Sequence, residues 1–268
     1  MEKMYSVEDG WFKLEHGLVN EGLIAIASGK GGVGKSTVTV NLALALHKLG
    51  RRVGIIDADI HGFSIPRIIG LTDKPRAFNE KEIIPPEVNG VKVMSAGSMI
   101  AENKAIIWRA PMLLGVLEQF MKDVHWGELD YLLFDLPPGT GDMPLNIMQQ
   151  ISDAGILIVT TPQVAATKVA SRVGSMAKQL DSDILGIIEN MSYYQCDKCG
   201  DKEYIFGQGG GQKMAKELDS KLLTQLPLMA TIRQGSDQGK PVVIAEPEAE
   251  ATQKFIAVAE KLIAQRAR

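Results

Sequence analysis

The most constraining feature of the chain is the run GKGGVGKST at residues 29–37. It contains the phosphate-binding pattern G-x-x-x-x-G-K-[ST], in which successive backbone N–H groups turn toward the β- and γ-phosphates of a nucleotide. Glycines are needed there because side chains would block the phosphates and because some positions require a positive φ. An apolar run precedes the loop and a helical pattern follows it, which is the context that such a loop requires. We predict that the residues binding the nucleotide here are Gly29, Lys30, Gly31, Gly32, Val33, Gly34, Lys35, Ser36 and Thr37.

The rest of the chain alternates short apolar runs with helical stretches. Strands are predicted at 23–28, 52–57, 91–96, 131–137, 155–162 and 184–191, and helices at 36–50, 112–122, 144–151, 165–179 and 248–267. Most of these strands are almost continuously apolar, as in a parallel sheet that is covered on both faces. The fold class predicted is therefore α/β, a doubly wound and mostly parallel sheet of the P-loop NTPase type with helices on both faces.

Length and composition fit one large domain. The chain has 268 residues, of which 45% are hydrophobic and 23% charged, ordinary values for a globular protein. We expect a lead-in at residues 1–20, which shows no clear period, and a single ATPase domain at residues 21–268. The stretch 72–90, rich in proline and charge, is expected to be an exposed excursion between strands.

Net charge, the length of apolar runs and the number of cysteines disfavour several classes of protein. A net charge of −3 gives no electrostatic case for nucleic acid. No apolar run approaches the ~20 residues needed to span a bilayer, so no membrane partner is expected. The charged N-terminal segment has no apolar signal core, and two cysteines are too few for a disulfide scaffold. We therefore expect a cytoplasmic protein.

Acidic residues at strand ends are candidates for the magnesium site. The apolar run YLLFD ends in Asp135, the Walker B pattern in which a buried strand projects one carboxylate toward Mg²⁺. In the loop, Lys35 is expected to neutralise phosphate charge, and Ser36 to ligate the Mg²⁺ ion.

The cysteines, Cys196 and Cys199, form a CxxC turn at 196–199. Two thiolates on one tight turn suit a soft metal centre, but Zn²⁺ and a [4Fe–4S] cluster both require four ligands. One chain offers two ligands, so a twofold homodimer offers four. A redox disulfide and two unliganded thiols are the alternatives.

These motifs together resemble one family. GKGGVGKST, DADIHGFSIP, DLPPGTGD and ENMSYYQCDKCG are similar to the corresponding segments of the Mrp/ApbC family of iron–sulfur cluster carriers, from about residue 20 to the end. That family lies within the ParA/MinD-related class of P-loop ATPases, whose deviant Walker A loop carries an extra early lysine.

The resemblance implies roles for individual residues. Lys30 would reach across a homodimer to the partner's nucleotide and, with Lys35 and Asp59, form the catalytic set. Asp59 would sit near the attacking water, and Asp57 would support Mg²⁺ through water. Asn190 would pair with the adenine edge. The protein would then be a slow ATP hydrolase that binds a [4Fe–4S] cluster, or zinc in the isolated form. Its partners would be apo iron–sulfur proteins, to which it transfers the cluster, and an assembly scaffold.

Two other functions compete with this one. A ParA/MinD-like positioning ATPase is suggested by the C-terminal helix at 254–268, which is amphipathic with a basic end, as in membrane-targeting tails. Such a protein has no need of the two thiolates. An electron-donating reductase like the nitrogenase iron protein would carry its cluster cysteines on separate loops rather than on one turn.

Three histidines carry no recognisable ligand spacing. His16, His47 and His125 are scattered along the sequence, and we expect them to be structural or solvated.

Overall fold

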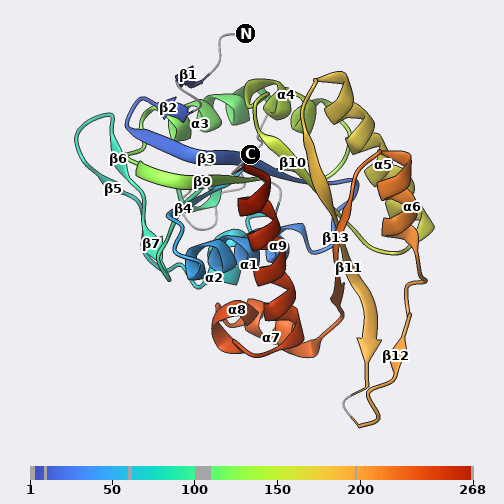
Figure 1. The fold of residues 1–268 in the computed structure, drawn as a ribbon. Coiled ribbons are helices and arrows are strands. Elements are labelled where there is room, and N and C mark those ends of the chain that lie inside the picture. Colours follow the sequence, from blue (N-terminus) through green and yellow to red (C-terminus); the bar gives the residue numbers. More distant parts are fainter. Residues whose placement is uncertain (1–3, 9–10, 60–61, 100–109, 197, 267–268) are drawn as a thin grey trace.

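The computed structural model describes residues 4–8, 11–59, 62–99, 110–196 and 198–266 (Figure 1). Its centre is a sheet of parallel strands in the spatial order β13, β11, β10, β3, β9, β4, β8. These strands are β3 (Gly17–Ser28), β4 (Val53–Asp57), β8 (Val91–Ser95), β9 (Gly127–Asp135), β10 (Gly155–Thr160), β11 (Ile184–Gln195) and β13 (Leu222–Pro227).

Short antiparallel strands extend this sheet at its margins. β1 pairs with β2 and β2 with β3, while β7 pairs with β8 and β12 with β11. A separate small ribbon joins β5 to β6. The bounds are β1 (Ser6–Glu8), β2 (Trp11–Leu14), β5 (Arg76–Ala77), β6 (Ile83–Ile84), β7 (Glu87–Val88) and β12 (Lys202–Glu203).

Helices cover both faces of the sheet (Figure 1). One face carries α1 (Lys35–Lys48), α2 (Ile65–Ile69), α7 (Ala230–Asp237), α8 (Val242–Ala245) and α9 (Glu250–Arg266). The other carries α3 (Ala110–Lys122), α4 (Asp142–Gln150), α5 (Val164–Gln179) and α6 (Gly210–Glu217). A short 3-10 helix, η1 (Ala96–Met99), follows β8.

The pleat of the central strand explains the unbroken apolar pattern. Along β3, Leu23 and Ala25 enter the core under α3–α6, while Ile24 and Ile26 enter the core under α1 and α9. Successive side chains of a strand point to opposite faces, so a strand buried on both sides has no polar position. The predicted doubly wound α/β fold is confirmed.

The structure contains several short elements that were not predicted. The lead-in at 1–20 contains β1, β2 and the start of β3, and β2 has the alternating burial of a strand with one face on the core. The apolar residues of this lead-in are too few to establish the two-residue period of a strand in the sequence. The other elements that were not predicted are also short: α2, β5, β6, β7, η1, β12, α6, β13, α7 and α8. The end of the predicted C-terminal helix, Ala267, lies outside the described residues.

No helix within the described residues combines the length and apolar character needed to cross a bilayer.

Candidate functional site

The phosphate loop lies at the carboxyl edge of the sheet, between the end of β3 and the start of α1. Gly32 and Gly34 adopt left-handed conformations with φ of 78° and 84°. A Cβ atom on Gly34 would lie 2.2 Å from Nδ2 of Asn190, whereas one on Gly31 or Gly32 would meet nothing within 4 Å. The loop is therefore tightly packed at its base and open above Gly31 and Gly32, where phosphates would approach.

A cavity of about 400 Å³ opens above this loop. Its walls combine loop residues with the segments that follow β4 and β9. The lining residues are Ser28, Lys30, Gly31, Gly32, Gly34, Lys35, Ser36, Thr37, Asp59, Gly62, Ser64, Ile68 and Pro138. Seven of the loop residues predicted to bind nucleotide therefore line one cavity: Lys30, Gly31, Gly32, Gly34, Lys35, Ser36 and Thr37.

Asp135 is the most connected residue of the site. Its fully buried carboxylate lies 2.7 Å from the ammonium of Lys35, and it accepts hydrogen bonds from the hydroxyls of Ser36 at 2.6 Å and Thr39 at 2.7 Å. A buried carboxylate requires this degree of compensation because its desolvation is costly. The strand-end acid and the loop therefore form one polar network.

Asp57 lies behind that network and Asp59 at the cavity wall. Asp57 is 1% exposed and accepts hydrogen bonds from the Ser95 hydroxyl at 2.9 Å and the Asp59 N–H at 3.2 Å. Burial, followed by the nearby Asp135 carboxylate, raises the pKa of Asp57 to about 8. Asp59 Oδ2 is 3.7 Å from Lys35 Nζ. Three strand-end carboxylates thus gather around one ammonium.

Lys30 extends from the loop to a neighbouring element of its own chain. Its ammonium donates a hydrogen bond to Oε1 of Gln163, 3.0 Å away, at the start of α5. The side chain lines the cavity in this position. Any reach toward a partner chain requires the Gln163 contact to break.

Asn190 contacts the loop from the side of β11. Its Nδ2 donates to the carbonyl oxygen of Val33 at 2.8 Å, and the residue is 8% exposed. In this structure the Asn190 amide is therefore hydrogen-bonded to the backbone of the phosphate loop. That the same amide pairs with the adenine edge of a nucleotide stays a prediction.

The CxxC turn lies at the tip of the β11–β12 hairpin, which protrudes from the body of the molecule (Figure 1). The turn is closed by hydrogen bonds from Cys196 N to Asp201 O at 2.9 Å and from Gly200 N to Cys196 O at 2.8 Å. Cys199 is exposed, Cys196 is half-buried, and they are not joined in a disulfide. β11 follows β10 in parallel to Glu189 and then continues past the carboxyl edge, the same edge at which the loop lies.

Sequence reasoning missed several residues that complete the site. Thr39 was recognisable as lying one helical turn after Lys35. Ser95 and Gln163 follow or end neighbouring strands, where carboxyl-edge residues converge. His16 and His125, which are far apart in the sequence, are brought side by side by the fold.

Comparison with protein families gives a match over most of the chain. A family model described as ParA, NUBPL iron-transfer P-loop NTPase, matches residues 20–263. An iron–sulfur cluster carrier protein of Bacillus subtilis is 52% identical over 205 residues, covering 76% of this chain and 58% of its own length. One of Haemophilus influenzae is 47% identical over 241 residues, covering 90% of this chain and 65% of its own. The chain thus spans about three fifths of the length of these relatives.

Solved structures give the same fold. A nucleotide-binding protein from Archaeoglobus fulgidus in complex with ADP superposes with a TM-score of 0.76 at 39% identity, covering 88% of this chain and 92% of that one. The cell division ATPase MinD of Pyrococcus furiosus superposes with a TM-score of 0.68 at 25% identity, covering 91% and 99%.

Proposed function

The chain belongs to the family of NUBPL iron-transfer P-loop NTPases, and from this membership we propose that it is an ATP-dependent carrier of iron–sulfur clusters. The observation that carries the proposal is the joint presence of two sites at one edge of the sheet. One is the phosphate loop with its Lys35–Asp135 network, and the other is the Cys196–Cys199 turn. We propose that residues 21–268 act as one ATPase domain that contains both.

ATP hydrolysis requires placement and charge neutralisation more than covalent chemistry. Lys35 would exchange its contact with Asp135 for the β- and γ-phosphates, and the open backbone at Gly31 and Gly32 would cradle them. Ser36 and Asp135, with Asp57 behind them, offer the hard oxygen ligands that Mg²⁺ prefers. When bound, the ion would neutralise charge on the phosphate oxygens. Asp59 in the cavity wall would orient the attacking water.

A homodimer would complete both sites. Lys30 is proposed to leave Gln163 and contact the nucleotide of the partner. Because the phosphate loop and the CxxC hairpin lie at the same edge, one twofold interface there could bring together both loops and both cysteine pairs. Four thiolates would then hold one [4Fe–4S] cluster, with zinc as the occupant of an isolated preparation.

The cargo would be exchanged through an exposed site. Cys199 is exposed at a hairpin tip, so an assembly scaffold or an apoprotein could approach the cluster without unfolding of the core. We propose the cytoplasm as the compartment in which these thiols stay reduced.

The alternative of a positioning ATPase is less well supported. Its proposed membrane-targeting face belongs to α9, but Phe255, Val258 and Leu262 of that helix are buried in the core against α1. A packed apolar face is not available to a bilayer.

Anaerobic reconstitution tests the proposal. The purified chain is loaded with iron and sulfide, examined by visible absorption and Mössbauer spectroscopy, and then mixed with an apo iron–sulfur protein with and without Mg·ATP. We expect a [4Fe–4S] spectrum, transfer of the cluster to the apoprotein, and an effect of ATP on the transfer rate. Stoichiometric zinc with no reconstitutable cluster would contradict the carrier function, whereas ATPase activity alone would favour the positioning alternative.

A further inference from the structure

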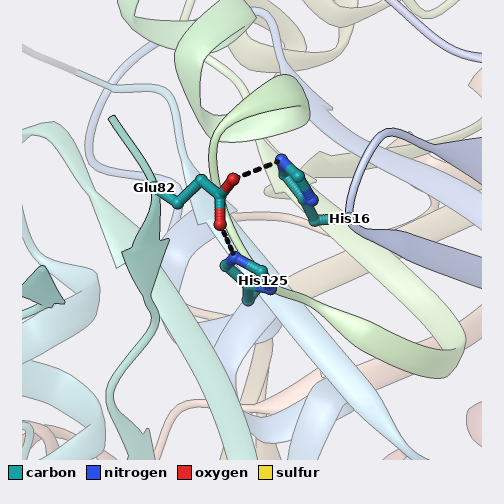
Figure 2. Close-up of side chains that lie close together, drawn as sticks. All are labelled: His16, Glu82 and His125. Atoms are coloured by element: carbon teal, nitrogen blue, oxygen red, sulfur yellow. Dashed lines mark hydrogen bonds and ion pairs between the residues drawn. The ribbon is translucent and has the colours of Figure 1, made fainter. Parts of the chain in front are cut away.

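A cluster of metal-ligating side chains lies at the amino edge of the sheet, opposite the nucleotide cavity. It consists of His16, Glu82 and His125, whose ligand atoms all lie within 4.8 Å of one another (Figure 2). Glu82 lies between the two imidazoles: Nε2 of His125 is 2.5 Å from one carboxylate oxygen and Nε2 of His16 is 3.7 Å from the other. The two rings stack with centroids 4.5 Å apart and an interplanar angle of 23°.

The cluster is assembled from three separate segments. His16 lies in the turn between β2 and β3, Glu82 just before β6, and His125 between α3 and β9. Sequence spacing could not reveal it, because His16 and Glu82 are 66 positions apart and Glu82 and His125 are 43 positions apart.

Backbone hydrogen bonds hold these segments in register. The carbonyl of His16 accepts from Gly127 N at 3.1 Å, and His125 N donates to Ile83 O at 2.9 Å. The N–H of Glu82 donates to the Asn79 side chain at 2.9 Å, which fixes the turn that carries the carboxylate. The backbone around each of the three residues is therefore fixed by hydrogen bonds that do not involve the side chains of the cluster.

We propose that His16, Glu82 and His125 form a binding site for a divalent transition-metal ion, with Zn²⁺ as the best match. Two imidazoles and one carboxylate are one of the ligand sets of open zinc sites, which leave one position for water. Metal–ligand distances of ~2.0–2.2 Å place neighbouring ligand atoms ~3.3–3.5 Å apart, so only small side-chain shifts are needed from the observed separations.

A hydrogen-bonded clasp without metal explains these contacts less completely. The His16–Glu82 distance of 3.7 Å exceeds hydrogen-bond length, yet the Nε2 atom of His16 still faces the carboxylate. Half-burial of all three side chains leaves a path for the ion, with side-chain exposures of 25% for His16 and Glu82 and 32% for His125.

The location predicts a stabilising role. β3 has 12 residues and runs from the His16 turn to the phosphate loop, a span of roughly 35–40 Å at the usual rise per residue. An ion here would crosslink the β2–β3 turn, the 72–90 excursion and the α3–β9 connection. It would stabilise the folded chain by binding the native state and would not touch the nucleotide.

Zinc titration of the full chain tests this site. The parent carries Cys196→Ser and Cys199→Ser so that the thiolates cannot compete, and it is stripped with chelator before calorimetric titration with ZnCl₂. We expect about one Zn²⁺ per chain and a zinc-dependent rise in Tm. His16→Ala and His125→Ala should each weaken binding by at least roughly 10- to 100-fold and abolish the rise in Tm. His47→Ala, an exposed histidine on α1, is the matched control and should bind as the parent.

Two further measurements make the outcome decisive. Glu82→Gln keeps the shape of the side chain and should also weaken zinc binding, which decides the case if a histidine variant fails to fold. Co²⁺ in place of Zn²⁺ should give the visible d–d bands of a low-coordinate nitrogen and oxygen site. The absence of saturable binding by the parent, or unchanged affinity in both His16→Ala and Glu82→Gln, would overturn the proposal.

Discussion

The ammonium of Lys35 lies 2.7 Å from the buried carboxylate of Asp135, so the main cation of the phosphate loop is already paired within the chain. Nucleotide binding must therefore replace one anion with another around Lys35. Because Lys35 and Asp135 would both change partners when nucleotide binds, substitutions at either residue should alter nucleotide binding.

Lys35→Ala should abolish tight binding of Mg·ATP. The change removes the counter-charge of the phosphates, a loss of roughly 2–4 kcal/mol, or about 30- to 1,000-fold in affinity. Calorimetry with ATP measures it. Lys48→Ala, at the exposed end of α1, is the control and should bind normally. Equal affinities for the two variants would contradict the assignment of the loop.

Asp135→Asn and Asp59→Asn should fail in different ways. The first removes a charge from the network of Ser36 and Lys35, so Mg²⁺-dependent ATP binding should weaken. The second removes a carboxylate in the cavity wall, so hydrolysis should slow while ATP stays bound. Binding with and without Mg²⁺ and single-turnover hydrolysis distinguish the two effects. Identical behaviour of the variants would refute the division of roles.

Lys30→Ala should slow hydrolysis more than it weakens ATP binding, because the proposed contact of Lys30 is with the partner's nucleotide. Gln163→Ala provides a matched test, since it removes the in-chain acceptor of the Lys30 ammonium and should leave hydrolysis equal or faster. The rate of ATP hydrolysis is measured at several protein concentrations, because a contact between chains requires the dimer. A parallel loss of binding and hydrolysis in Lys30→Ala would indicate a role within one chain instead.

The nucleotide-free protein should lose stability as pH rises between about 4 and about 8 through Asp57. In the unfolded chain this carboxyl ionises near its ordinary pKa of 3.8, whereas in the folded chain burial raises the pKa to about 8. The native state therefore binds more protons in that window, and its stability falls with pH by at most about 1.4 kcal/mol per unit.

Asp57→Asn cannot ionise and should flatten this dependence, so its stability relative to wild type should improve from pH 5 to pH 8. Urea unfolding in EDTA at several pH values measures the difference. The exposed Asp73→Asn should track wild type. An Asp57→Asn profile parallel to wild type would show that Asp57 is ionised throughout.

Changing either Cys196 or Cys199 to Ala should abolish cluster binding and transfer. Each variant leaves two thiolates in a dimer, and two ligands do not hold a four-iron cluster. Wild type should carry about one cluster per dimer. Folding and ATP binding should survive because the turn lies at a hairpin tip away from the cavity. Normal transfer by Cys196→Ala, or one intact cluster per monomer, would eliminate the bridging model.

Much of the fold was predictable because its signals are local. The run at 29–37 predicted a strand, a loop and a helix, and α1 begins at Lys35, one residue before the predicted start. Continuous apolar runs predicted the strands of the parallel sheet, since burial on both faces excludes polar residues from them. The β1–β2 hairpin was missed because three- and four-residue strands give too short a pattern to measure.

The sequence by itself determined which residue types stand at the strand ends: the loop lysines, the carboxylates and the paired cysteines. Only the tertiary structure decided which of them meet. Strand order places β9 between β3 and β4, and this brings Asp135 to Lys35 and close to Asp57. The same order sets the starts of β3 and β9 side by side, which joins His16 to His125. Such contacts depend on long-range pairing of strands, and no periodicity along the chain encodes it.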